Sequence, residues 1–242
     1  MLTTSVLIIL HEVLEAAFIF AALLALTASV RQPLRWSLRA LLIGLLLAAV
    51  YGYFLRDVST WLGGTGQEIV NLCLQVTAYC ALLICVFLGA RESFAKATGA
   101  SSLTTVMTVA ASCAVALEGS EIFVYIAGFV RTDAAAASAG IGSLVGLCIG
   151  LSVGVLFYHL LQLLSATRSR RLILACVIVV GTGMAAQGTR ELVQASLITV
   201  GSPLWDTSRF LPEDSVAGQF LYALSGYEAT PSATEFTLYL AA

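Results

Sequence analysis

The chain has 242 residues, of which 59% are hydrophobic and only 11% are charged. Soluble domains carry about 25% charged residues, so this composition excludes an ordinary soluble domain. The net charge of −2 offers no basic surface for a nucleic-acid partner. Apolar runs of about 20 residues recur along the chain, and each is long enough to cross a lipid bilayer as a helix.

Six long apolar segments predict six membrane-spanning helices, at residues 3–30, 38–55, 68–89, 103–130, 139–165 and 172–188. A polar stretch follows, and then a short helix is expected at residues 216–224. The final apolar segment, residues 232–242, is too short to span alone. It either lies partly in the membrane or begins a seventh helix. The predicted fold class is therefore an all-α polytopic membrane protein with six to seven transmembrane helices.

Charged residues differ between the two sides of the predicted bundle. The loops after the first, third and fifth segments are rich in basic residues, namely Arg31, Arg35, Arg39, Arg91, Lys96, Arg168, Arg170 and Arg171. The other loops mix acidic and basic residues. Because an excess of Lys and Arg marks the cytoplasmic face, we expect the N-terminus to lie outside.

A weak internal repeat relates the first three segments to the next three. The sequence EVLE at residues 12–15 corresponds to EGSE at residues 118–121, and GARE at 89–92 corresponds to GTRE at 188–191. Since each copy has three segments, the second copy must cross in the opposite direction. We therefore predict an inverted repeat of residues 1–100 and 101–195, followed by an extracytoplasmic region at 196–242. Secondary transporters often have such repeats, with their binding sites near the midplane.

The two E-x-x-E motifs are the candidate functional site. Glu12 and Glu15 share one helix face, as do Glu118 and Glu121, and both pairs lie near the middle of their segments. An ionised side chain at that depth costs at least about 2.5–3.5 kcal/mol. The four carboxyl groups must therefore be paired, protonated or bound to a cation. Four such oxygen ligands suit a hard cation, for example iron, manganese, magnesium or calcium.

His11 lies four residues before Glu15 and shares its helix face. It is a candidate metal ligand, proton carrier or charged partner of the carboxylates, and a hydrogen-bonded structural histidine is the plainer alternative. The order H-E-x-x-E is close to the zinc-protease motif H-E-x-x-H, but the second histidine is missing. We therefore expect no enzyme, and no organic cofactor is predicted.

These motifs resemble those of the oxidase-dependent iron transporter family, which includes the iron permeases of yeast and bacterial EfeU-type proteins. The resemblance rests on the two E-x-x-E helices, the outside N-terminus and the tail that begins PLWDTSRFLPEDS at residue 203. It implies seven membrane helices, iron binding by the glutamates of both motifs and a place in the bacterial inner (plasma) membrane. It also implies an extracytoplasmic oxidase or iron-donor protein as partner. The family motif is R-E-x-x-E, and here His11 and Leu117 replace the two arginines.

The function expected from these features is import of a metal cation, with iron as the first candidate. Loss of both arginines leaves the oxidation state of the iron open, because a fixed guanidinium would be missing beside each carboxylate pair. Two alternatives remain from the sequence. One is transport of another divalent metal such as manganese, and the other is a non-transporting membrane subunit that anchors a redox or metal-handling complex.

Overall fold

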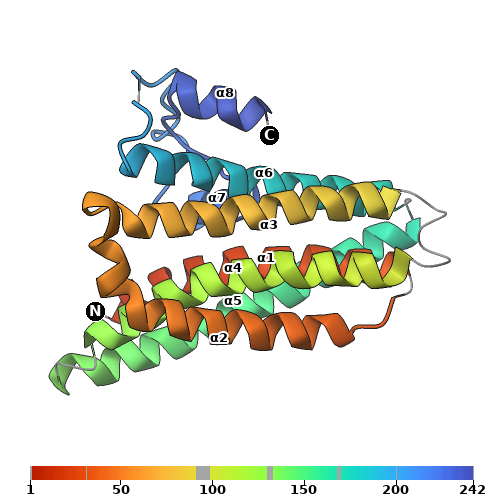
Figure 1. The fold of residues 1–242 in the computed structure, drawn as a ribbon, viewed down its shortest axis with the longest axis horizontal. Coiled ribbons are helices and arrows are strands. Elements are labelled where there is room, and N and C mark those ends of the chain that lie inside the picture. Colours follow the sequence, from red (N-terminus) through yellow and green to blue (C-terminus); the bar gives the residue numbers. More distant parts are fainter. Residues whose placement is uncertain are drawn as a thin grey trace.

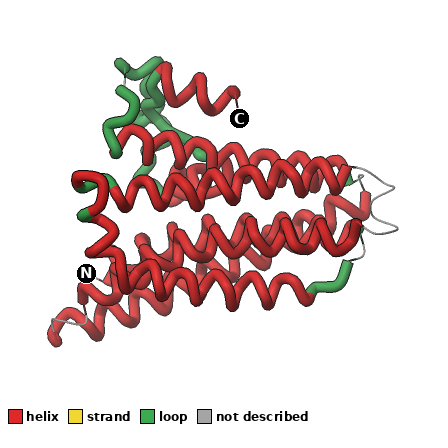
Figure 2. The backbone as a smooth tube through the Cα atoms, viewed as in Figure 1, coloured by secondary structure: helices red, strands yellow, loops and turns green. Residues whose placement is uncertain are grey.

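In the computed structural model the chain is a bundle of helices (Figure 1). The structure describes residues 2–30, 32–90, 99–129, 133–167, 170–199 and 201–241, which are predominantly helical (Figure 2). The long helices are α1 (Leu2–Ser29), α2 (Arg35–Ser59), α3 (Gly66–Ala90), α4 (Gly99–Phe129), α5 (Asp133–Thr167) and α6 (Arg171–Gln194). All six are long and apolar enough to cross a membrane. The prediction of a polytopic all-α membrane protein is confirmed.

The sixth predicted segment ended too early. Helix α6 continues to Gln194, so Arg190 and Glu191 lie within the helix and do not follow its end. The sequence prediction stopped at residue 188 because polar residues interrupt the apolar run there, although they do not interrupt the backbone helix. The corresponding residues of the first repeat, Arg91 and Glu92, lie outside the described residues, as do Arg31, Lys96 and Arg168.

The long helices of the bundle pack in pairs. Helix α1 packs most extensively on α5, and α4 packs most extensively on α2. In the predicted repeat α1 corresponds to α4 and α2 to α5, so these two pairs correspond to each other. Helices α3 and α6 also pack on each other, and α1 contacts α4. Because three crossings separate them, α1 and α4 run in opposite directions (Figure 1). The two E-x-x-E helices therefore meet as antiparallel equivalents.

The close packing of α1 on α5 and of α4 on α2 depends on small residues. Every fourth residue of one α5 face is glycine, and a Cβ added to Gly146 would lie 2.6 Å from the Val6 carbonyl oxygen of α1. On α2, a Cβ added to Gly44 would lie 2.6 Å from Val115 Cβ of α4. Small residues let membrane helices approach closely. We call these surfaces the small-residue faces: Gly142, Gly146, Gly150 and Gly154 on α5, and Gly44, Ala48 and Gly52 on α2.

Exposure differs strongly between the inner and outer helices. Residues of α1 such as Phe18 and Leu23 are fully buried in the core. Helices α2 and α5 expose many large aliphatic side chains, with Leu46 65% and Leu156 67% exposed. Bands of exposed leucine fit a hydrocarbon solvent, because in water they would be costly. The two outer helices therefore present the lipid-facing surface.

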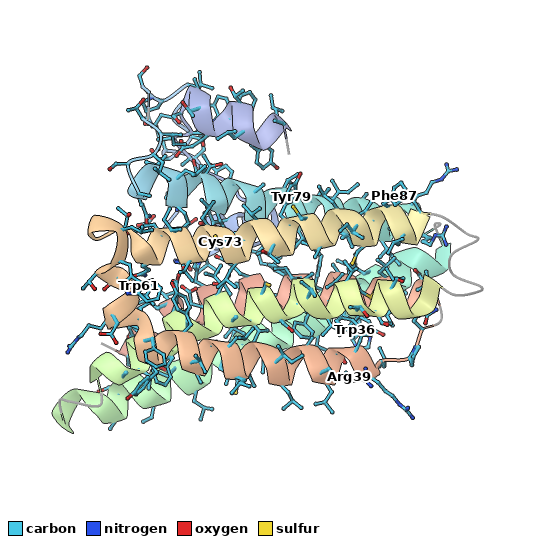
Figure 3. All side chains as sticks on the ribbon, in the orientation of Figure 1. Trp36, Arg39, Trp61, Cys73, Tyr79 and Phe87 are labelled. Carbon is cyan, nitrogen blue, oxygen red and sulfur yellow. The ribbon has the colours of Figure 1, made fainter. Side chains whose placement is uncertain are left out.

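Among the described basic residues that predict the cytoplasmic side, Arg39 and Arg170 lie at the same end of the bundle (Figure 3). Figure 3 places Arg39 and Trp61 towards opposite ends of the bundle. Arg170 donates a hydrogen bond to the Ala90 carbonyl oxygen at 3.1 Å, which joins the start of α6 to the end of α3 at the same end as Arg39. The basic residues Arg39 and Arg170 are thus close to one end of the folded bundle as well as to the ends of their segments. The position of the N-terminus on the outside stays a prediction.

The C-terminal region folds back onto the bundle. Helix α7 (Val216–Ser225) begins at Ser215, whose hydroxyl accepts a hydrogen bond from the Gly218 amide at 3.0 Å. It ends at Gly226, whose φ of 69° is a conformation that favours glycine. Helix α7 packs on α1 and α6, and α8 (Ala233–Ala241) packs on α6. Residues 201–232 therefore bring a short helix to the edge of the E-x-x-E region.

Candidate functional site

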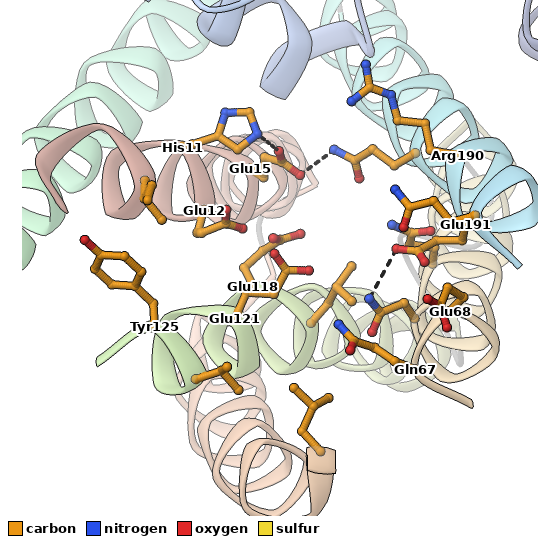
Figure 4. Close-up of a pocket in the computed structure, with 18 of the residues that line it drawn as sticks. His11, Glu12, Glu15, Gln67, Glu68, Glu118, Glu121, Tyr125, Arg190 and Glu191 are labelled. Atoms are coloured by element: carbon orange, nitrogen blue, oxygen red, sulfur yellow. Dashed lines mark hydrogen bonds and ion pairs between the residues drawn. The ribbon is translucent and has the colours of Figure 1, made fainter. Parts of the chain in front are cut away.

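All five residues predicted for the site line one cavity of about 520 Å³. The cavity lies among α1, α3, α4 and α6, and Tyr222 of α7 contributes to its wall. Figure 4 shows the glutamates of both motifs turned towards a common space. We call it the acidic cavity. The residues from the two motifs that line it are His11, Glu12, Glu15, Leu117, Glu118 and Glu121.

The first motif is held by a chain of polar contacts. His11 Nε2 lies 3.0 Å from Glu15 Oε1, and the Gln187 side-chain amide donates a hydrogen bond to Glu15 Oε2. The imidazole of His11 stacks on Tyr222 with ring centroids 5.1 Å apart. Its Nδ1 atom has no hydrogen-bond partner among the described residues. His11 therefore orients Glu15 through Nε2, while its buried Nδ1 is left without a partner among the described residues.

The second motif has a different chemistry at the equivalent position. Leu117 is only 2% exposed and supplies packing alone. Glu118 is buried and lines the acidic cavity with Glu12. Glu121 is exposed and faces the acidic cavity, so it is the more accessible carboxylate of this motif.

A polar stripe on α3 forms the opposite wall, and sequence reasoning missed most of it. Glu68, Asn71 and Gln75 lie three and four residues apart, which places them on one helix face. The Asn71 amide nitrogen donates to Glu191 Oε1 at 3.2 Å, and the Tyr51 hydroxyl donates to Asn71 Oδ1 at 2.7 Å. The spacing of polar residues within an apolar segment was the available signal for this wall.

Arg190 pairs with the C-terminal region and not with its neighbour in sequence. Its Nε donates to Glu228 Oε1 at 2.6 Å, and its Nη2 lies 3.6 Å from Glu213 Oε2. The guanidinium carbon also lies 4.7 Å from the centroid of the Tyr222 ring. Burial raises the pKa of Glu228, and the Arg190 charge opposes that effect. Arg190 thus fastens α7 and the following loop to α6.

The acidic cavity has an excess of negative groups. Six carboxyl side chains line it, and the lining includes two basic side chains, His11 and Arg190. Arg190 is committed to Glu213 and Glu228, and His11 to Glu15. Isolated buried carboxylates are costly unless they are paired, protonated or bound to a cation. The described residues contain no group of three or more His, Cys, Asp or Glu side chains already arranged to hold a metal. The arrangement is therefore a shared acidic cavity and not a closed coordination shell.

No family model, curated protein or solved structure matches the chain at a significant level. The resemblance to iron permeases therefore stays a prediction, as does metal binding by the two motifs. The chain's place as an integral membrane protein rests on its six apolar helices.

Proposed function

We propose that the chain is a membrane permease that imports a metal cation, with iron as its first candidate cargo. The observation that supports this most is the acidic cavity, where two antiparallel E-x-x-E helices bring four carboxyl groups to one space. Ionisable residues inside a membrane usually mark a pathway for ions or protons. The proposed location is the bacterial inner membrane, with the cavity end of the bundle outside and an oxidase or iron-donor protein as its outer partner.

The proposed cargo is a hard cation because the cavity is lined with oxygen atoms. Carboxylate and amide oxygens suit iron and manganese better than they suit copper(I). His11 adds one nitrogen at the first motif, where it can bind iron or accept a proton. Since no arginine precedes either pair in the sequence, the two motifs carry more negative charge than the R-E-x-x-E pattern would. Such a site can take Fe²⁺, Fe³⁺ or Mn²⁺.

Transport requires the two repeats to rearrange around the cavity. Beyond the motifs, towards the end of the bundle that carries Arg39, α1 buries Phe18 and α4 buries Met107, and neither side chain is exposed. A cation held by Glu15 and Glu118 therefore meets packed apolar side chains in this conformation. In the proposed cycle the repeats move against each other at the α1–α4 contact, as in other transporters built from inverted repeats.

Uptake assays with carboxyl-to-amide variants test the proposal. Glu15→Gln and Glu121→Gln should each lower iron uptake at least about tenfold in cells that lack other iron importers, because each removes a cargo ligand. Asp57→Asn removes one negative charge from the exposed end of α2 and is the matched control. Normal uptake by both glutamine variants, at wild-type protein amounts, would reject the permease. Liposomes that move neither Fe²⁺ nor Mn²⁺, with a partner protein that copurifies, would favour the anchoring subunit.

A further inference from the structure

We propose that the acidic cavity holds a second cation subsite on its α3–α6 wall, built from Glu68, Gln75 and Glu191. The proposal rests on the proposed function, since it names where the cation binds before it reaches the two E-x-x-E motifs. Figure 4 shows Glu68 and Glu191 across the cavity from the motif glutamates. The subsite is therefore separate from the one that the motifs form.

The two helices bring these three side chains to one wall. Glu68 and Gln75 share the polar face of α3, and Asn71 between them donates to Glu191 of α6. A Cβ added to Gly188 would lie 3.5 Å from Gln75 Oε1, so this amide oxygen faces α6 one turn from Glu191. The wall therefore offers oxygen atoms from both α3 and α6.

Gln75 is the observation that points to a ligand. Its side chain lines the acidic cavity and is only 5% exposed, and its Oε1 atom has no hydrogen-bond partner among the described residues. A buried acceptor without a partner costs about 1–3 kcal/mol. Glu68 Oε2 on the same helix face is also buried and without a partner in the described chain. Glu68 and Gln75 lie two helical turns apart, about 10 Å along α3, so a partly hydrated cation would reach one of these oxygens directly and the other through a bound water molecule.

The charge of this wall leads to the same conclusion. Glu68 and Glu191 face the cavity, whose two basic side chains are engaged elsewhere, His11 by Glu15 and Arg190 by the C-terminal region. The neutral Asn71 amide donates to Glu191 but leaves its charge uncompensated. A partly hydrated divalent cation fits here, because two carboxylates, one amide oxygen and water molecules make an oxygen-ligand set of the kind that Mn²⁺ accepts.

The position of the wall makes it a loading site. Glu68 lies in the first turn of α3 and Glu191 in the last turn of α6, near the same end of the bundle. The motif glutamates lie several turns into α1 and α4, at about 1.5 Å per residue. A cation that enters from this end therefore meets Glu68 and Glu191 before it reaches the motif glutamates.

Titration of the purified full chain with Mn²⁺, read by electron paramagnetic resonance, tests the subsite. Wild-type protein should bind two Mn²⁺ ions. The double variant Glu68→Gln/Glu191→Gln should bind one, and Glu15→Gln/Glu121→Gln should also bind one, at the other subsite. Gln75→Leu should weaken only the α3–α6 subsite, about tenfold, and Asp57→Asn should change neither. Size-exclusion profiles and retention of the unaltered subsite show that each variant is folded.

The outcomes separate this proposal from the permease itself. A single Mn²⁺ that is lost in the Glu15/Glu121 variant but kept in the Glu68/Glu191 variant overturns the second subsite and leaves the permease standing. A single Mn²⁺ with the opposite dependence supports the α3–α6 subsite and overturns metal binding by the motifs. Wild-type protein that binds no Mn²⁺ overturns both.

Discussion

The two E-x-x-E helices lie in equivalent surroundings but carry different chemistry. Helix α1 packs on the small-residue face of α5, and α4 packs on the small-residue face of α2. At the position before the motif, however, the first copy has His11 and the second has buried Leu117. His11 reaches Glu15 and Tyr222, whereas Leu117 can only pack. The packing of the two motif helices is therefore alike, while the residue that precedes each motif differs in chemistry.

This difference shows which constraints act on each part of the motif. The backbone approach of the helices tolerates little change, because an added Cβ would meet a carbonyl oxygen or another Cβ at 2.6 Å. The position before the first glutamate holds a polar residue in one copy and an apolar residue in the other, and of these two only His11 contacts a motif carboxylate in the described chain. Substitutions at the small-residue faces should therefore be more damaging, and similarly so in both repeats, than substitutions at residues 11 and 117.

The largest effect is expected at the small-residue faces. Gly146→Leu and Gly44→Leu should each destabilise the protein by about 3 kcal/mol or more, because a large side chain must displace the opposing helix. Gly140→Leu is the matched control, since a Cβ at Gly140 meets nothing within 4 Å. The measurements are the yield of monodisperse protein and the melting temperature. If Gly44→Leu left the yield and the melting temperature unchanged while Gly146→Leu lowered both, the two small-residue faces would not be equivalent.

A smaller effect is expected at the asymmetric position. His11→Leu removes the contact to Glu15 and should weaken Mn²⁺ binding by the motifs about tenfold, because a hydrogen bond to a charged group contributes about 1.5–3 kcal/mol. His11→Gln can still donate to Glu15 and should restore most of the affinity. Leu117→Met keeps volume at the equivalent position and should leave the affinity unchanged. Equal losses in His11→Leu and His11→Gln would instead make the imidazole a direct metal ligand.

The sequence predicted the bundle because its signals are local or periodic. Glutamates three residues apart in an apolar segment must share a helix face, and their recurrence in the fourth segment pointed to the repeat. The same logic could have found the α3 wall, since Glu68, Asn71 and Gln75 follow helical spacing. They were missed because Asn71 and Gln75 are uncharged and barely alter the apolar character of their segment.

Other parts of the cavity depend on contacts that local patterns do not encode. Tyr222 stacks on His11, and Glu228 pairs with Arg190, only because residues 201–232 fold back over α6. The local sequence around Tyr222 and Glu228 does not indicate that residues 201–232 fold back over α6. The structure finds the partner of Arg190 38 residues away, although Glu191 is its neighbour in sequence.

The smallest effect is expected where the C-terminal region is fastened to the repeats. Arg190→Gln leaves Glu228 partly buried without its charged partner and should cost about 1 kcal/mol near neutral pH, because Arg190 is 36% exposed and solvent screens the pair. Residues 201–232 should then become more sensitive to protease, while the six long helices stay protected. Arg209→Gln is the matched control, because Arg209 is exposed. Unchanged proteolysis in Arg190→Gln would show that apolar packing of α7 alone holds this region.

The pH dependence of the stability lost in Arg190→Gln identifies the side chain responsible for the loss. Burial raises the pKa of Glu228, nearby Glu235 and Glu213 act in the same direction, and Arg190 opposes them. In Arg190→Gln the opposition is gone, so the folded variant binds a proton at Glu228 more readily than the unfolded chain does. Its stability must then rise as the pH falls towards the folded pKa. The deficit relative to wild type should therefore shrink at mildly acidic pH, where neutral Glu228 needs no cation. A deficit that stays constant with pH would assign the loss to Arg190 stacking on Tyr222.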